Sequence, residues 1–175
     1  DGTPVNTTPV IIGVYGDKGD KGDKGDDGVN QGSNLLYNSS FLSKDRWNFS
    51  PNVSIVSGLD NTKAVYCTCD SNTDAINMAQ QELFSSTIKT IATEQWYTLS
   101  FWAKGSGSMA SFVYPNTIDN THIGKIDGVD AWLPGDACAK FSLTNEWVKH
   151  SVTFKTKNSI SVGYLLFRLY ASSSA

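Results

Sequence analysis

Apolar and polar residues alternate with a period of two over much of the chain beyond residue 34. The clearest case is Gln95–Lys104, where one side carries Tyr97, Leu99, Phe101 and Ala103 and the other carries Trp96, Thr98, Ser100, Trp102 and Lys104. Trp147–Thr156 and Val162–Ala171 alternate in the same way. This period is typical of β-strands that bury one face, so we expect three long amphipathic strands.

Six shorter segments complete the predicted set of strands: Asn34–Phe41, Val53–Val56, Ala64–Thr68, Ile76–Leu83, Met109–Tyr114 and Ala137–Leu143. Turn-forming runs such as SGLDN, KGSGS, IDG and LPGD separate them. Asp74–Ile91 also fits a helix, but a strand is the preferred interpretation. About nine strands in about 140 residues predict an all-β fold, an antiparallel β-sandwich of the jelly-roll type.

A different period marks the region before these strands. Glycine recurs at every third position, at Gly13, Gly16, Gly19, Gly22, Gly25 and Gly28. A collagen triple helix requires this period because three chains meet at an axis with no room for a side chain. Residues 13–30 therefore predict a homotrimer with a rod about 50 Å long. A flexible, charged, Gly-rich linker is the alternative.

Composition divides the chain into three parts: residues 1–12 as an N-terminal linker or neck, 13–30 as the rod, and 31–175 as the head. Residues 1–32 hold three Lys and six Asp, which leaves eleven basic and eleven acidic residues in 33–175. A head with this balance gives no reason to expect nucleic acid as a partner. No apolar run approaches the roughly twenty residues of a membrane span. The start at Asp1, without a signal peptide, indicates a fragment or a processed chain.

The three cysteines are Cys67, Cys69 and Cys138. We expect small buried thiols in a chain assembled in a reducing cytoplasm. A zinc site is disfavoured because His122 and His150 stand alone in the sequence. A disulfide from Cys138 to one of the other two remains an alternative.

Three sequence stretches resemble the carbohydrate-binding modules of families 4 and 9. They are Asn34–Phe41 followed by Trp47, then Trp96–Lys104, then Asn145–Phe154 with the closing strand Leu165–Leu169. The resemblance covers most of residues 34–170 and implies a sandwich head that binds glycans. The family's last strand, which carries an acidic pair and helps to build a calcium site, has no counterpart before the sequence ends at Ala175.

A collagen-like rod joined to such a head resembles the receptor-binding proteins of tailed bacteriophages. This resemblance implies a trimeric adhesin in the virion, at the tail or fibre tip, that is assembled in the host cytoplasm. Its partners would be the host cell-wall or capsular polysaccharide and other tail or baseplate proteins.

A sugar site needs exposed aromatic rings and a few polar groups. Trp132 is the first candidate because it follows Asp127 and Gly128 in a segment that reads as a loop; packing at the sandwich edge or in a trimer interface is the alternative. Trp102 and Trp96 share the polar side of their strand, and Tyr114, Asn116, Tyr164, Arg168 and Tyr170 are secondary candidates. Trp47 and Trp147 are expected in the core. Asp127, Asp130 and Asp136 are weak candidates for holding Ca²⁺.

Two other functions remain open. In the first alternative, the chain is a structural fibre segment or spacer without a ligand. In the second, it is a polysaccharide depolymerase. Glycoside hydrolysis needs two carboxylates that flank one bond, and no motif pairs Glu82, Glu94 or Glu146 with another acid. We therefore expect no enzymatic activity and no cofactor.

Overall fold

The computed structural model describes residues 8–12, 34–69, 75–134 and 139–170. The predicted rod, Asp136 and Cys138 lie outside these residues. The described part is all-β, with antiparallel sheets and one short 3₁₀ helix, η1 (Leu59–Asn61). Within the same part, no helix has the length and apolar character of a membrane span.

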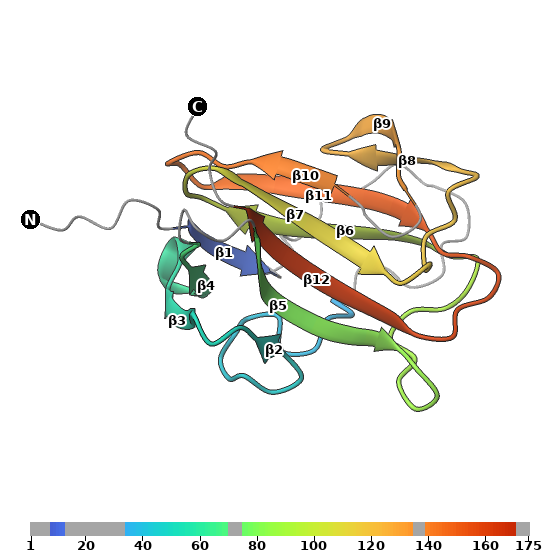
Figure 1. The fold of residues 1–175 in the computed structure, drawn as a ribbon, viewed down its shortest axis with the longest axis horizontal. Helices are drawn as coiled ribbons and strands as arrows, with labels where there is room; N and C mark the ends of the chain where they lie inside the picture. Colours follow the sequence, from blue (N-terminus) through green and yellow to red (C-terminus); the bar gives the residue numbers. More distant parts are fainter. Residues whose placement is uncertain (1–7, 13–33, 70–74, 135–138, 171–175) are drawn as a thin grey trace, which may run out of the picture.

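The strands form two sheets, which Figure 1 shows one behind the other. The seven-stranded sheet has the order β3-β4-β1-β6-β11-β8-β9. Its strands are β1 (Thr8–Ile12), β3 (Val53–Ser57), β4 (Lys63–Cys67), β6 (Trp96–Ala103), β8 (Ile123–Ile126), β9 (Val129–Trp132) and β11 (Val148–Lys155). The five-stranded sheet has the order β10-β7-β12-β5-β2, with β2 (Asn48–Phe49), β5 (Ala75–Phe84), β7 (Ser108–Tyr114), β10 (Ala139–Ser142) and β12 (Gly163–Tyr170).

The two sheets share one core, and the predicted alternation decides which side chains enter it. The Phe101 ring of β6 lies 5.0 Å from the Phe167 ring of β12 and 5.3 Å from the Phe141 ring of β10. Leu99, Phe101 and Ala103 are buried, whereas Trp96, Thr98 and Ser100 on the other side of the same strand are exposed. The amphipathic interpretation of this strand is therefore confirmed.

The prediction of a strand at Asn34–Phe41 was wrong, because this segment forms turns. Asn38 and Phe41 both have positive φ, at 48° and 53°, which no β-strand accommodates. The Asn34 side chain accepts a hydrogen bond from the Leu36 N–H (3.1 Å), the local contact by which Asn favours turns. The segment still packs on the domain, since the Tyr37 N–H donates to Gln81 Oε1.

The segment around Trp132, which the sequence predicted to be a loop, is largely a β-hairpin, so the loop prediction was wrong. Strands β8 and β9 pair antiparallel, with Ile123 opposite Trp132 and Ile126 opposite Val129. Asp127 and Gly128 form the turn with φ of 48° and 81°, the left-handed values that a two-residue Asp-Gly hairpin requires. Strand β9 is an edge of the seven-stranded sheet.

Strand β1 changes the predicted domain boundary. Thr8–Ile12 was assigned to an N-terminal linker or neck, but it lies inside the seven-stranded sheet between β4 and β6. Val10 pairs with Val65 on one side and with Ala103 on the other. At least this part of residues 1–12 therefore belongs to the sandwich.

Cys67 and Cys69 are both buried, as expected for structural thiols. Cys67 ends β4, and Cys69 lies just beyond the strand. Burial, with a smaller contribution from Cys69, raises the pKa of Cys67 to about 11. Its thiol is therefore protonated and a poor nucleophile at neutral pH.

Candidate functional site

The outer side of the five-stranded sheet carries aromatic and amide side chains that lie next to one another across neighbouring strands. Tyr114 of β7 lies opposite Tyr164 of β12, and their ring centroids are 5.8 Å apart. The Tyr114 hydroxyl donates a hydrogen bond to Gln80 Oε1 of β5 at 3.1 Å. Because β12 lies between β7 and β5, this bond crosses over the central strand. We call this outer side, with Tyr114, Tyr164, Gln80, Phe112 and Arg168, the tyrosine face.

Arg168 extends the tyrosine face along β12. Its Nε donates to Asn77 Oδ1 at 2.7 Å, and its guanidinium carbon lies 5.0 Å from the centre of the Phe112 ring. The hydrogen bond and the aromatic contact fix the plane of the guanidinium, which leaves its remaining N–H groups as oriented donors. Next along the face, Lys140 Nζ lies 4.6 Å from the centre of the Tyr170 ring.

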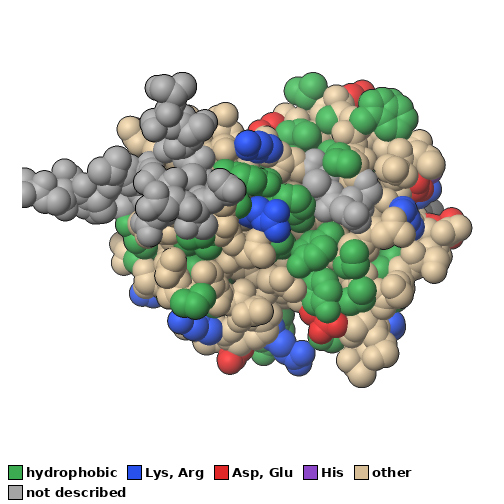
Figure 2. Space-filling view, in the orientation of Figure 1, with side chains coloured by type: hydrophobic (Ala, Val, Ile, Leu, Met, Phe, Trp, Pro, Cys, Tyr) green, Lys and Arg blue, Asp and Glu red, His purple; other side chains and the backbone are tan. Residues whose placement is uncertain are grey.

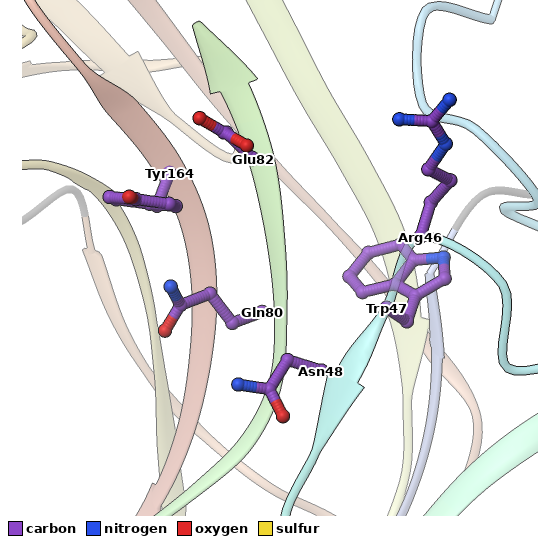
Figure 3. Close-up of a pocket in the computed structure, with 6 residues that line it drawn as sticks. All are labelled: Arg46, Trp47, Asn48, Gln80, Glu82 and Tyr164. Atoms are coloured by element: carbon purple, nitrogen blue, oxygen red, sulfur yellow. The ribbon is translucent and has the colours of Figure 1, made fainter. Parts of the chain in front are cut away.

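A hollow opens at the β2 end of the same sheet. It has a volume of about 360 Å³ and is lined by Arg46, Trp47, Asn48, Gln80, Glu82 and Tyr164. In Figure 3, Gln80 and Glu82 come from β5 and Tyr164 from β12, and Arg46 and Trp47 stand across from them. Gln80 and Tyr164 belong to both the hollow and the tyrosine face, so the two form one continuous surface.

Apolar residues form the floor of this surface. Leu166 alternates to the outer side of β12, yet only 2% of it is exposed, and Ala110 of the neighbouring β7 is 4% exposed. The aromatic and long polar side chains therefore cover them. Figure 2 shows hydrophobic side chains gathered over the middle of the molecule, with Lys or Arg side chains among them and an acidic side chain at their margin.

The environment of Tyr114 favours its neutral form. Burial, and to a lesser extent the neighbouring Tyr164, raises the pKa of Tyr114 above its usual value, while Arg168 opposes the shift. The hydroxyl therefore stays protonated at physiological pH. It can donate to Gln80 and still accept a hydrogen bond from a ligand.

The predicted site residues fall on two surfaces. The structure brings Tyr114 and Arg168 together on the five-stranded sheet, and Tyr164 and Tyr170 lie on the same side. It places Trp132, Trp96 and Trp102 on the seven-stranded sheet instead, in β9 and β6. Trp132 and Trp96 are 64% and 50% exposed, and Trp102 is half-buried at the far end of β6 from Trp96.

Of the two tryptophans predicted in the core, only Trp47 lies there. It is 6% exposed, and its Nε1 donates to the carbonyl oxygen of Tyr37 at 3.0 Å. Trp147 is half-buried just before β11, with Lys104 Nζ 5.9 Å from the centre of its ring. The prediction for Trp147, made from the family resemblance, was wrong because Trp147 lies one residue before β11 and is only half-buried.

The described calcium candidates have other partners. Asp127 Oδ2 lies 2.9 Å from Nδ1 of the buried His150, and Asp127 Oδ1 accepts from the Ser151 N–H at 2.6 Å. Asp130 forms an ion pair with Lys125 at 3.5 Å. Across residues 8–12, 34–69, 75–134 and 139–170, no group of three or more His, Cys, Asp or Glu side chains is arranged to hold a metal ion.

Sequence reasoning missed Gln80, Glu82, Asn77 and Phe112. Gln80 and Glu82 alternate with Ala79, Gln81 and Leu83, so the pattern of the strand alone places them on the side opposite the core. Asn77 breaks that pattern, because the pairing of β5 with β12 shifts register between Phe167 and Arg168. No sequence signal indicates this shift.

Comparison with known proteins returned no match: no protein-family model, no curated protein and no solved structure is significantly similar to this chain. The function is therefore inferred from the surface itself.

Proposed function

We propose that the tyrosine face and its hollow bind a carbohydrate without cleaving it. The observation that carries the proposal is the pair of tyrosine rings, Tyr114 and Tyr164, set beside the fixed polar groups of Gln80 and Arg168. A sugar ring has apolar C–H faces that pack on aromatic rings, and hydroxyls that pair with amides and guanidinium groups. The face offers both kinds of group on rigid strands.

The charges of the hollow favour binding over hydrolysis. Its six lining residues include a single carboxylate, Glu82. Both glycosidase mechanisms use a pair of carboxylic acids about 5–10 Å apart, one on each side of the scissile bond. We therefore assign Glu82 the role of a hydrogen-bond acceptor for sugar hydroxyls.

The ligand of the tyrosine face is a neutral glycan. Arg168 is held by Asn77 and Phe112, and Lys140 lies over Tyr170, so these cations have neutral partners. Arg46 and Glu82 add one charge of each sign at the hollow. Binding therefore rests on the aromatic rings and neutral hydrogen bonds, and the affinity should depend little on salt.

In the wider proposal the chain is a phage adhesin, a homotrimer whose jelly-roll heads bind host surface polysaccharide. The period-three glycines of residues 13–30 support it, since a triple helix sets three heads on one frame. Three linked weak sites raise avidity by about 10²–10⁴ over one site.

The position of β1 restricts how a rod can form. Ile12 ends β1 in the seven-stranded sheet, and the chain returns to the same domain by Tyr37, which bonds to Gln81. A straight rod of about 50 Å is longer than a domain of about 140 residues is wide, roughly 35–40 Å. Residues 31–36 can span only about 20 Å, so a rod with both ends on one domain runs alongside that domain. A rod that projects away from the domain instead requires β1 to leave its sheet.

A glycan array of host-type cell-wall polysaccharides, followed by calorimetry at low and high salt, tests the binding proposal. Tyr164→Ala should weaken binding about tenfold or more, because loss of an aromatic contact costs one to a few kcal/mol. Tyr66→Ala is the matched control, a half-buried tyrosine of β4 on the other sheet. If no neutral glycan binds, the structural-spacer function replaces the adhesin.

A further inference from the structure

A second surface with exposed tryptophans lies on the outer side of the seven-stranded sheet. Trp132 of β9 pairs with Ile123 of β8, and Trp96 of β6 pairs with Lys155 of β11. The register of β8 with β11, in which Lys125 pairs with Thr153, sets Ile123 level with Lys155. Four side chains thus form one line across four adjacent strands, which we call the tryptophan row: Trp132, Ile123, Lys155 and Trp96.

The tryptophan row is unusually exposed for such large side chains. Trp132 is 64% exposed, and Ile123 and Trp96 are each 50% exposed. Three inter-strand steps separate the two tryptophans, so their backbone positions lie about 14 Å apart. Two exposed rings at this separation can contact different units of one extended oligosaccharide.

A polar cluster of His122, Asp119 and Lys155 lies beside Trp96, at one end of the row. The His122 ring meets Trp96 edge-on, with centroids 6.1 Å apart and an interplanar angle of 86°. His122 Nδ1 is 2.9 Å from Asp119 Oδ2, and His122 Nε2 is 3.3 Å from Lys155 Nζ. Because a carboxylate only accepts, Nδ1 donates to Asp119, and because an ammonium only donates, Nε2 accepts from Lys155.

Asp119 is fixed as the anion of this cluster. The Thr121 N–H and hydroxyl both donate to Asp119 Oδ1, at 3.0 Å and 2.6 Å. The hydroxyl of Thr121, its N–H and, more weakly, His122 hold the pKa of Asp119 below its usual value. Asp119 pairs with His122, which leaves the ammonium of Lys155 without a carboxylate partner among the ion pairs of the described residues.

Hydroxyl groups continue the surface along β6 and β11. Thr98 and Thr153 are paired in register, and their Oγ1 atoms are 2.9 Å apart. The other lysine near the row, Lys125, already pairs with Asp130. The row thus offers two aromatic rings, two hydroxyls and the ammonium of Lys155, which lies within hydrogen-bond distance of His122 Nε2.

We infer that the tryptophan row is a second carbohydrate-binding site, one for an acidic glycan. An anionic group of the ligand, carboxylate or phosphate, accepts from the ammonium of Lys155, and sugar rings pack on Trp96 and Trp132. The inference is independent of the neutral-glycan site, because it uses the other sheet and the opposite requirement for charge. A second copy of the chain is the less favoured occupant, because a cationic group in the middle of an apolar row suits an anion better than a protein core.

The test uses the full chain and two acidic probes, a galacturonic acid oligomer for carboxylate and a glycerol-phosphate oligomer for phosphate. A neutral oligosaccharide that binds the tyrosine face serves for comparison. We expect at least one acidic probe to bind with an affinity that falls as salt rises. Lys155→Met should weaken that binding about tenfold, the loss typical of one charge-assisted contact, and Lys155→Arg should largely restore it. The probe that binds identifies the anionic group.

Lys140→Met is the matched control, since it removes the same charge from the five-stranded sheet. Binding of the acidic probe should change little in this variant, and binding of the neutral probe should not change in Lys155→Met. Equal losses in the two lysine variants would reduce the effect to net charge and overturn the inference. The inference would also be overturned if neither acidic probe binds. A lower oligomeric mass in Trp96→Ala would overturn it as well, because it would assign the tryptophan row to contacts between copies of the chain.

Discussion

The Tyr114 hydroxyl and Gln80 Oε1 are joined by a 3.1 Å hydrogen bond that spans the central strand of the five-stranded sheet. The bond connects β7 to β5 above β12 and holds the Gln80 amide at the mouth of the hollow. With Oε1 occupied, Gln80 presents its NH₂ group to a ligand as a donor. This contact makes a preorganised surface from three separate segments of the chain.

The first prediction concerns the titration of Tyr114. Its pKa is raised in the folded protein above the ordinary value of 10.0, mainly by burial. The protonated phenol therefore contributes stability that is fully present below pH 10 and is lost as pH rises through the folded-state pKa. Ultraviolet difference titration should show one tyrosine ionising later than the others, and Tyr114→Phe should remove that phase. A late phase that persists in Tyr114→Phe would contradict this assignment.

Gly124 should be the most sensitive position of the β8–β9 hairpin. A Cβ there would lie 2.4 Å from the Thr153 carbonyl oxygen and 2.6 Å from Leu133 Cδ1, so Gly124→Ala forces the hairpin away from β11. We expect a loss of about 1–3 kcal/mol, typical of overpacking, in chemical denaturation. Gly128→Asn is the control, because Gly128 has φ of 81° with open space around it and Asn tolerates that conformation. Equal losses of stability in Gly124→Ala and Gly128→Asn would contradict the close approach of Gly124 to Thr153 and Leu133.

Asp127 should stabilise the hairpin through His150. The Asp127 carboxylate bonds to the ring of the buried His150 and to the Ser151 N–H, so Asp127→Ala leaves a buried nitrogen unsatisfied. The expected loss is about 1–3 kcal/mol. Asp130→Ala, which removes an exposed ion pair with Lys125, should cost about 0–1 kcal/mol. If thermal melts show no difference between the variants, the His150 contact contributes nothing.

The sequence predicted most of the fold, because the period-two pattern reflects burial directly. Gln95–Lys104 and Trp147–Thr156 became β6 and β11 with the expected faces toward the core. The β8–β9 hairpin was missed although Asp127 and Gly128 are a strong hairpin signal, because each of its strands has only four residues, too few for a clear period-two pattern. Strand β1 was missed because five residues before a glycine-rich run carry no alternation of their own.

The candidate surfaces were predicted less completely. Alternation placed Tyr164, Arg168 and Tyr170 on one side of a strand, but only the pairing of β7 with β12 brings Tyr114 to Tyr164. Trp96 and Trp132 are 36 positions apart, and their alignment depends on the order of four strands. Strand order is a property of the whole topology, which local patterns do not encode.

The oligomeric state tests the rod. We expect light scattering to give about three times the 19.0 kDa of one chain, and Gly22→Ala to lower that mass, since the triple-helix axis has no room for a methyl group. Deletion of residues 1–12 should leave the trimer intact, because the rod of residues 13–30, and not β1, holds the three chains together. A monomer that is destabilised by this deletion would mean that β1 stays in the sheet and that residues 13–30 act as a linker.

The most direct test of the central claim compares Tyr164→Ala with Trp132→Ala in calorimetric titrations of the full chain with the same neutral oligosaccharide. The two substitutions remove aromatic rings from opposite sheets, a half-buried one at Tyr164 and an exposed one at Trp132. We predict that Tyr164→Ala weakens binding about tenfold or more, while Trp132→Ala leaves it unchanged and both variants stay folded in thermal melts. Loss of neutral-glycan binding in Trp132→Ala, with normal binding in Tyr164→Ala, would contradict the account and move the site to the seven-stranded sheet.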